Sequence, residues 1–306
     1  MEKFLDGRVA VVTGAGRGLG RAEAIALAEA GASVIVNDLG VDLDGLGSSH
    51  EPADEVVREI VQQGGRAAAN YESVADYEGA GRIVRQALDT FGRIDILVNN
   101  AGILSYDTLD EYTPEEWHKV ISIHLTGTFY MCRQAVPHMK AQKYGRILNT
   151  TSNAWNLPTG LIGYAAAKGG ITTMTWALAF ELRPFGITVN AIAPFGYTRG
   201  VEPGLARKKK KFEAGQISPE RYNKTAVYPD ASYSTGMLLF LLSPEADEIN
   251  GCVVRSGGGK VSRFTHPEDS MVLWRDYEKD GPWTVDELRK ILPTTMFANS
   301  KKAPHL

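Results

Sequence analysis

Short apolar runs alternate along the chain with longer segments in which apolar residues recur at helical spacing. Most of the short runs are rich in β-branched residues and do not alternate with polar positions, which is typical of strands buried on both faces. The longer segments have the spacing of amphipathic helices, and several of them end at a glycine. The predicted strands are residues 8–12, 33–37, 66–70, 94–98, 146–150, 187–193 and 252–256, and the predicted helices are 21–32, 52–65, 80–92, 114–139 and 163–186.

This alternation predicts an α/β fold with right-handed crossovers, a Rossmann-type doubly wound parallel sheet. No domain boundary is visible before about residue 256, so residues 1–256 are predicted to form one domain. Residues 197–230 interrupt the alternation with a polar segment punctuated by Pro and Gly, and we expect them to form a substrate lid over the carboxyl edge of the sheet. Residues 257–306 form a C-terminal extension, in which Thr284 and Glu287 predict a capping box that begins a helix.

The composition excludes several classes of function. The chain has 306 residues, of which 43% are apolar, and 36 acidic against 33 basic residues give a net charge of −3. Such a chain can bury a large core, but it lacks the basic field that nucleic-acid binding requires. No apolar run is long enough to cross a membrane, and no signal peptide precedes the first predicted strand. Two cysteines, Cys132 and Cys252, favour a reducing compartment, so we expect a cytoplasmic protein without nucleic-acid or membrane partners.

A glycine-rich turn joins the first predicted strand to the first predicted helix. Its glycines, Gly14, Gly18 and Gly20, have the spacing TGxxxGxG, which differs from the commoner GxGxxG. Glycines here allow a tight turn and let a pyrophosphate approach the backbone, while the helix N-terminus faces the phosphate. Between a strand and a helix, the motif therefore predicts a dinucleotide site, which includes Arg17 and Leu19, rather than a merely tight turn.

Asp38 follows the second predicted strand, about twenty residues beyond the glycine loop. A carboxylate there can accept hydrogen bonds from the adenosine ribose hydroxyls and would repel a 2′-phosphate, which favours NAD over NADP. Arg17 could instead bind that 2′-phosphate. Its flexible side chain can also extend into solvent, however, whereas the Asp38 carboxylate is held at the ribose. We therefore expect NAD as the cofactor; the alternative for Asp38 is a residue that only forms the turn.

Tyr164 and Lys168 lie one helical turn apart in the segment YAAAK. Such pairs are common on helices, so this spacing alone does not identify a function. Together with TGAGRGLG at 13–20, NNAG at 99–102 and Ser152, it has the order and spacing of the classical short-chain dehydrogenase/reductase family, which the chain resembles over about residues 5–260. The resemblance implies that Tyr164 is the general acid/base and that Ser152 holds the substrate oxygen. It also implies that Lys168 lowers the pKa of the tyrosine from about 10 and holds the nicotinamide ribose.

The same resemblance assigns further cofactor contacts, and it implies a homo-oligomer, a dimer or more particularly a tetramer. The family's chemistry requires no metal, and the six histidines and two cysteines have no ligand-like spacing. The implied contacts are Asn99, Asn100, Ala101 and Gly102 under the adenosine, Ser73 and Val74 at the adenine, and Pro194, Gly196 and Thr198 near the nicotinamide amide.

Two positions depart from the family pattern. The family's serine usually lies thirteen residues before its tyrosine, whereas Ser152 lies twelve before Tyr164, so Thr151 at the usual spacing is the alternative. His124 stands where most members have an asparagine that holds a bent helix and a water of the proton relay. Because an imidazole both donates and accepts hydrogen bonds, His124 either takes that role or merely packs.

A narrower resemblance concerns the substrate. Segments such as VNDLGVDLDGLG and INGCVVRSGGGKVSRF are similar to the (3R)-hydroxyacyl-CoA dehydrogenase unit of the peroxisomal multifunctional β-oxidation enzyme, a subgroup also counted among hydroxysteroid dehydrogenases, in which His124 also occurs. It implies a small-molecule secondary alcohol or ketone as the partner and, within that class, a (3R)-hydroxyacyl-CoA. The similarity fades at 153–163 and 197–230, so a free alicyclic, terpenoid or steroid alcohol is an alternative substrate, and a non-catalytic NAD-binding sensor or scaffold is an alternative function.

Two groups of residues bear on that choice. The lysine run Lys208–Lys211 could meet the phosphates of CoA, or it could be the solvated face of a helix. An apolar pocket for the body of the substrate is one interpretation of five further residues, which core packing explains nearly as well: Trp155, Leu157, Leu161, Ile162 and Phe195.

Overall fold

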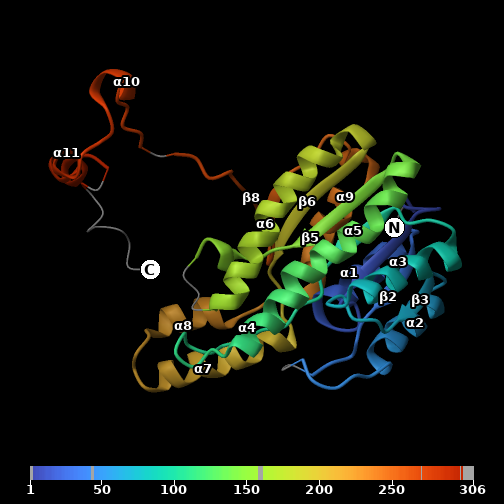
Figure 1. Ribbon diagram of the computed structural model, residues 1–306. Helices are drawn as coiled ribbons and strands as arrows, with labels where there is room; N and C mark the ends of the chain where they lie inside the picture. The colour runs from blue at the N-terminus through green and yellow to red at the C-terminus, as the bar shows by residue number, and fades with distance from the viewer. Residues whose placement is uncertain (1–2, 43–44, 158–160, 270, 297, 299–306) are drawn as a thin grey trace. The chain divides into compact units, whose positions relative to one another are not determined.

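A single sheet forms the centre of the first part of the chain (Figure 1). Among the residues described, eight strands follow the order β3-β2-β1-β4-β5-β6-β7-β8, and β8 alone pairs antiparallel with its neighbour. This confirms the predicted doubly wound arrangement, in which the chain changes direction across the sheet between β1 and β4. The strands are β1 (Val9–Thr13), β2 (Ser33–Asn37), β3 (Arg66–Asn70), β4 (Ile96–Asn99), β5 (Gly145–Thr150), β6 (Ile187–Pro194), β7 (Val253–Gly257) and β8 (Lys260–Phe264).

The computed structural model describes residues 3–42, 45–157, 161–269, 271–296 and 298, and it divides into two units, Met1–Phe264 and Thr265–Leu306. The first unit extends beyond residue 256 because β8 pairs with β7. The pattern of hydrophobic positions did not predict β8. Gly257, Gly258 and Gly259 have φ values of +140°, +59° and +77°, which a residue with a side chain rarely adopts and which the tight β7–β8 turn uses.

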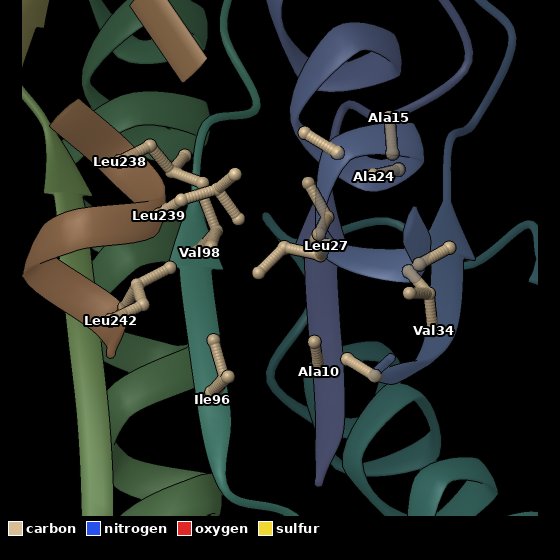
Figure 2. Close-up of a cluster of buried hydrophobic side chains, with 14 of the residues drawn as sticks. Ala10, Ala15, Ala24, Leu27, Val34, Ile96, Val98, Leu238, Leu239 and Leu242 are labelled. Atoms are coloured by element: carbon tan, nitrogen blue, oxygen red, sulfur yellow. The ribbon is translucent and has the colours of Figure 1, made fainter. Parts of the chain in front are cut away.

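Helices cover both faces of the sheet, and each face has its own apolar core. On one face α1, α2 and α9 pack against strand residues such as Val98, and Figure 2 shows Leu27 of α1 and Leu242 of α9 beside it. On the other face α3, α5 and α6 enclose a second cluster that includes Met131 and Leu182. The sheet is therefore held rigidly, with the carboxyl ends of β1, β4 and β5 at one edge. The helices are α1 (Gly18–Glu29), α2 (Glu51–Gln62), α3 (Tyr77–Phe91), α5 (Gly127–Gln142), α6 (Ile162–Leu182) and α9 (Thr235–Leu242).

One predicted helix, residues 114–139, is interrupted near its middle. Its first part is α4 (Pro114–Ile121), which begins with a capping box between Thr113 and Glu116, and its last part belongs to α5. Between them residues Ser122–Thr126 form a π-helical turn that contains His124. Such turns are rare and often occur at functional sites, because the wider turn changes the direction in which a side chain points.

The segment predicted as a lid contains two helices, α7 (Glu202–Glu213) and α8 (Pro219–Ala226). The loop before α4 holds the start of this segment. The hydroxyl of Tyr106 donates to the carbonyl oxygen of Gly200 at 2.7 Å, and Arg207 donates to the carbonyl of Tyr106 and lies 5.3 Å from its ring centre. These contacts therefore tie the turn before α7 and the second turn of α7 to the loop before α4.

The second unit contains two short helices, α10 (Tyr277–Asp280) and α11 (Val285–Ile291). The predicted capping box is present, since the Thr284 hydroxyl accepts from the backbone N–H of Glu287 at 3.3 Å and the Glu287 carboxylate accepts from that of Thr284 at 2.8 Å. Residues 270, 297 and 299–306 of the predicted extension lie outside the described residues. In the ranges that the structure describes, no helix combines the length and hydropathy needed to span a bilayer.

Candidate active site

A cavity of about 470 Å³ opens at the carboxyl ends of β1, β2, β4 and β5, where the chain changes direction across the sheet. Open α/β sheets bind their ligands at such a switch point, and the volume is in the range of cofactor sites. Most of the predicted site residues line it: Gly14, Arg17, Gly18, Leu19, Gly20, Asp38, Ser73, Val74, Asn100, Ala101, Gly102, His124, Tyr164, Lys168 and Thr198.

Four predicted residues are placed elsewhere. Asn99 is buried between strands, where its amide donates to Asn149 Oδ1 at 2.9 Å. Gly196 packs against Ala231, whose Cα would lie 2.9 Å from a Cβ at this position. Pro194 is the last residue of β6, and Ser152 lies beside Tyr164 just outside the cavity wall. The structure therefore gives Asn99 and Gly196 a role in positioning their loops.

The glycine loop has the geometry that close approach of a phosphate requires. Gly14 and Gly18 have φ values of +63° and +54°, and a Cβ on Gly20 would lie 2.3 Å from the carbonyl oxygen of Gly14. Helix α1 starts after Arg17, whose side chain makes no capping hydrogen bond. The N–H groups of the first turn therefore face the cavity without a side-chain cap, as a pyrophosphate site needs, and the residues fit a dinucleotide.

Backbone amides hold the Asp38 carboxylate at the far side of the glycine loop. One oxygen accepts from the N–H of Gly16 and the other from that of Gly40, each at 2.7 Å. A carboxylate oxygen has two lone pairs, so each can accept one further hydrogen bond from a ribose hydroxyl. The Arg17 side chain is exposed, and its guanidinium donates to the carbonyl of Val41 at 3.3 Å.

Other residues of the cavity wall were not predicted from the sequence. Arg199, just before α7, donates to the same Val41 carbonyl at 2.6 Å; burial and the charge of Arg17 lower its pKa. None of the five apolar residues proposed for a substrate pocket lines the cavity, and Trp155 instead packs against Trp176 and Phe264. Within the described residues, no cluster of three His, Cys, Asp or Glu side chains could hold a metal ion. The further wall residues include Ile103, Leu104, Ile123, Tyr197 and Gly200.

Three side chains of the proposed chemistry meet where α6 crosses the end of β5. The Ser152 hydroxyl lies near that of Tyr164 and lowers its pKa, and the Lys168 ammonium lies 5.4 Å from the centre of the tyrosine ring. Lys168 is 2% exposed, and its Nζ donates to the carbonyl oxygen of Thr150 at 2.5 Å. The arrangement places a phenol, an alcohol and an amine together at the cavity wall.

Burial dominates the electrostatics of this group. It raises the pKa of Tyr164, which the neighbouring Ser152 hydroxyl lowers in part. Burial also lowers the pKa of Lys168 to about 7. Desolvation thus disfavours the charged form of both groups, and the lowering of the tyrosine pKa by the lysine stays a prediction.

The choice between Ser152 and Thr151 is decided by where the two hydroxyls point. Thr151 is 1% exposed, and its hydroxyl lies 2.7 Å from that of Thr172 and 3.2 Å from the Lys168 carbonyl oxygen, inside the α6 interface. The Ser152 hydroxyl reaches Tyr164 and accepts from the N–H of Ala154 at 3.3 Å. The geometry favours Ser152, and the loop before Tyr164 is one residue shorter than usual.

His124 lies against both Tyr164 and the strand-end loop. Its ring centre is 5.2 Å from that of Tyr164, and Nε2 lies 2.7 Å from the carbonyl oxygen and 3.0 Å from the amide nitrogen of Ile103. A Cβ on Gly102 would lie 2.2 Å from Cε1, so only glycine fits there. Burial, with the charge of Lys168, lowers the pKa of His124 to about 3, so the imidazole is neutral.

A pH dependence of stability follows from the buried imidazole. His124 is neutral in the folded protein down to about pH 3, whereas in the unfolded chain it takes up a proton below 6.5, so acid favours unfolding. Between pH 7 and 5.5 we expect the free energy of unfolding to fall by about 1 kcal/mol more in the wild type than in His124→Asn. Urea titrations measure this; the exposed control His138→Asn should keep the wild-type slope, and equal slopes for both variants would contradict the buried neutral state.

Comparison with protein families gives a match to the short chain dehydrogenase model over residues 8–202. The matched range carries the glycine loop, Asp38 and the Tyr164–Lys168 pair at the cavity wall. The chain belongs to the short-chain dehydrogenase family. As members of this family do, it is an oxidoreductase that acts on hydroxyl groups with a nicotinamide cofactor, NAD or NADP.

Named relatives agree with the narrower resemblance. The chain is 50% identical over 285 residues to the peroxisomal multifunctional enzyme type 2 of Mus musculus, covering 93% of this chain but only 36% of that enzyme. It is 35% identical to the hydroxyacyl-CoA dehydrogenase ChsB1 of Mycobacterium tuberculosis, covering 94% of this chain and 88% of the other. A solved short chain dehydrogenase from Mycobacterium avium has a TM-score of 0.79 at 35% identity and covers 96% of both chains. The chain thus spans about a third of the mouse enzyme that it matches.

Proposed function

We propose that the protein is an NAD-dependent dehydrogenase that interconverts a secondary alcohol and a ketone, with Tyr164 as the acid/base. The observation that carries the proposal is that Tyr164 and Lys168, with the Ser152 hydroxyl beside them, lie at the wall of a cavity that also contains the glycine loop. A hydroxyl pair can bind one substrate oxygen at two points, which fixes the carbon that bears it against the cofactor site.

The residues of this chain handle the oxygen and the proton, and a bound nicotinamide supplies the hydride chemistry. In alcohol oxidation Ser152 donates a hydrogen bond to the substrate oxygen, and Tyr164 as phenolate takes the hydroxyl proton. In ketone reduction Tyr164 returns that proton. A protonated Lys168, whose Nζ lies 5.4 Å from the ring centre of Tyr164, favours the phenolate by its positive charge, whereas burial raises the tyrosine pKa. His124, neutral and packed on Tyr164, orients the phenol ring from its other side.

NAD is the proposed cofactor because of the charge at the ribose site. The fixed Asp38 carboxylate has free lone pairs that can accept from two ribose hydroxyls, and its negative charge repels the 2′-phosphate of NADP. Arg17 and Arg199 both donate to the Val41 carbonyl, so part of their hydrogen-bonding capacity is already used. These contacts support NAD over NADP.

Within this reaction class we propose a (3R)-hydroxyacyl-CoA as the substrate. The names of the relatives support a hydroxyacyl-CoA. The lysine run Lys208–Lys211 lies on α7, whose first turn follows the cavity residues Arg199 and Gly200, and Lys209 and Lys210 are exposed to meet phosphates.

The substrate is tested by NAD reduction with matched compounds: a (3R)-hydroxyacyl-CoA, its (3S) isomer, the free hydroxy acid and free alicyclic and steroid alcohols. We expect kcat/KM for the (3R) thioester to exceed that for the other compounds by about 100-fold. A substrate that places a group other than the carbinol C–H next to the nicotinamide loses several kcal/mol of transition-state stabilisation. Activity on free alcohols only would instead favour the alicyclic or steroid alternative. NAD binding without any turnover would favour a sensor or scaffold.

We further propose that the protein forms a homotetramer in the cytoplasm. Helices α5 and α6 are joined by the Lys140–Glu181 ion pair at 3.4 Å, and together they expose Phe129 and Phe180, the latter by 88%. A second copy of the chain would cover these rings. Light scattering should give the mass of four 33.3 kDa chains, and Phe180→Glu should give a smaller species. A monomeric wild type would contradict the proposal.

A further inference from the structure

Helix α7, at the start of the lid segment, has little of its own that keeps it folded. It has 12 residues, all of them described, and none of them is buried. Isolated helices of this length are marginal in water, and the lysine run Lys208–Lys211 adds repulsion between like charges at helical spacing. The residue before the helix is Val201, whose side chain makes no capping hydrogen bond. Contacts with residues outside α7 are therefore needed to hold it.

Tyr106, from the loop before α4, lies at the start of this helix. Its hydroxyl donates to the carbonyl oxygen of Gly200 at 2.7 Å, and a Cβ on Gly204 would lie 3.2 Å from the same hydroxyl. Burial raises the pKa of this phenol, and the backbone of Gly204 lowers it in part, as an N–H directed at the oxygen does. A hydroxyl can both donate to a carbonyl and accept from the N–H groups of a first turn. Tyr106 is therefore placed to supply the cap that Val201 does not.

A second contact joins Tyr106 to the next turn of α7. The Arg207 guanidinium donates to the carbonyl oxygen of Tyr106 and lies 5.3 Å from its ring centre. Gly204 and Arg207 are three residues apart, so they share the face of the helix that meets Tyr106. With that face held, Lys209 and Lys210 are exposed to solvent. The two contacts thus fix the rotation of α7 about its axis and with it the directions of the lysines.

The same tyrosine acts on the wall of the cavity. Gly200 and Leu104 both line the cavity, and a Cβ on Gly200 would lie 3.2 Å from the Leu104 side chain. The bond from the Tyr106 hydroxyl therefore joins two wall segments, the loop after β4 and the loop after β6. Tyr106 also raises the pKa of Tyr164, so the two phenols are close enough to interact.

We propose that Tyr106 is a positioning residue, which holds the start of α7 and so fixes the cavity wall at Gly200 and the lysine run for substrate binding. The inference rests on the proposed function, because it takes the lysines as the contact for the phosphates of the thioester. Without the hydroxyl, α7 opens more often from its first turn, and the wall and the lysines lose their fixed positions. Tyr164 and Ser152 keep theirs, so substrate binding weakens while the chemical step is unchanged.

The kinetic test is Tyr106→Phe, which removes one oxygen and leaves the ring beside Arg207. A net hydrogen bond changes an equilibrium by about fivefold, so KM for a (3R)-hydroxyacyl-CoA should rise by about that factor, while kcat should fall by less than about twofold. Tyr233→Phe, the same change at an exposed tyrosine in the turn before α9, should keep both constants. A wild-type KM in Tyr106→Phe, or a fall in kcat as large as the rise in KM, would overturn the proposal.

A second readout needs neither cofactor nor substrate, so it separates this inference from the proposed function. Hydrogen–deuterium exchange measured by mass spectrometry reports how often the α7 backbone opens. In Tyr106→Phe we expect peptides that cover Glu202–Glu213 to exchange about fivefold faster than in the wild type, and peptides of α3 to exchange as before. Tyr233→Phe should match the wild type in both helices.

The outcomes of this experiment distinguish the two proposals. Unchanged exchange of α7 in Tyr106→Phe, or an α7 without protection in the wild type, refutes the role of Tyr106 even if the protein is a dehydrogenase. Faster exchange of α7 in a protein that oxidises none of the alcohols leaves the hold of Tyr106 on α7 in place and refutes the dehydrogenase alone.

Discussion

The Tyr164→Phe enzyme is expected to bind the cofactor normally and to lose nearly all turnover. The change removes one oxygen, the atom that takes the substrate proton, and leaves the ring packed against His124. Positioned acid–base catalysis contributes roughly 10²- to 10⁴-fold, so we expect kcat to fall by that factor while the dissociation constant of the reduced cofactor, measured by fluorescence titration, stays within about twofold.

A matched control separates the loss of the hydroxyl from the loss of packing. Tyr233 is 66% exposed in the turn before α9, so Tyr233→Phe makes the same chemical change away from the cavity and should keep wild-type kcat. Substantial turnover in Tyr164→Phe would show that another group takes the proton, and weakened cofactor binding would show that the phenol shapes the site instead.

The second large effect is expected at the ribose end of the cavity. Asp38→Asn removes the negative charge that Gly16 and Gly40 hold in place and that repels a 2′-phosphate. Because juxtaposed like charges cost several kcal/mol, the ratio of kcat/KM with NADP to that with NAD should rise on the order of 100-fold. Asp38→Asn also leaves one backbone N–H, of Gly16 or Gly40, without its acceptor. That loss affects both cofactors equally, so the ratio of the two kcat/KM values isolates the effect of the charge.

Asp42→Asn is the control for net charge. Asp42 lines the same cavity but is exposed, so its neutralisation should change the ratio by less than about threefold. A wild type that prefers NADP would contradict the assignment and would instead point to Arg17 and Arg199 as the phosphate site.

The fold was largely predictable because its strands are buried on both faces. Strands such as β2 and β6 are buried along almost their whole length, and both were predicted at nearly the observed bounds. Helix α9 escaped prediction because it is apolar on all sides and so has no helical period. Strand β8 escaped because it lies at the sheet edge with polar residues on both sides, and only the glycine turn before it indicated a hairpin.

The site was predictable where one local segment carries the chemistry. Gly14 and Gly20 share a turn, and Tyr164 and Lys168 share a helix, so each spacing can be read locally and the motifs taken together indicate one site. Arg199 joins the cavity because the loop after β6 brings it to the carbonyl oxygen of Val41, in the segment after β2, which no local spacing reveals.

Charge states were the least predictable feature. Burial raises the pKa of Tyr164 and lowers that of Lys168, and spacing along the chain does not reveal how deeply either side chain lies.

The most direct measurement follows the hydride itself. The protein is mixed with NAD and a (3R)-hydroxyacyl-CoA that carries deuterium on the carbinol carbon, and the nicotinamide product is weighed by mass spectrometry. The account predicts reduced cofactor that is one mass unit heavier than the product from unlabelled substrate, formed by the wild type and not by Tyr164→Phe. Reduced cofactor without the label, or equal labelling by Tyr164→Phe, would contradict it.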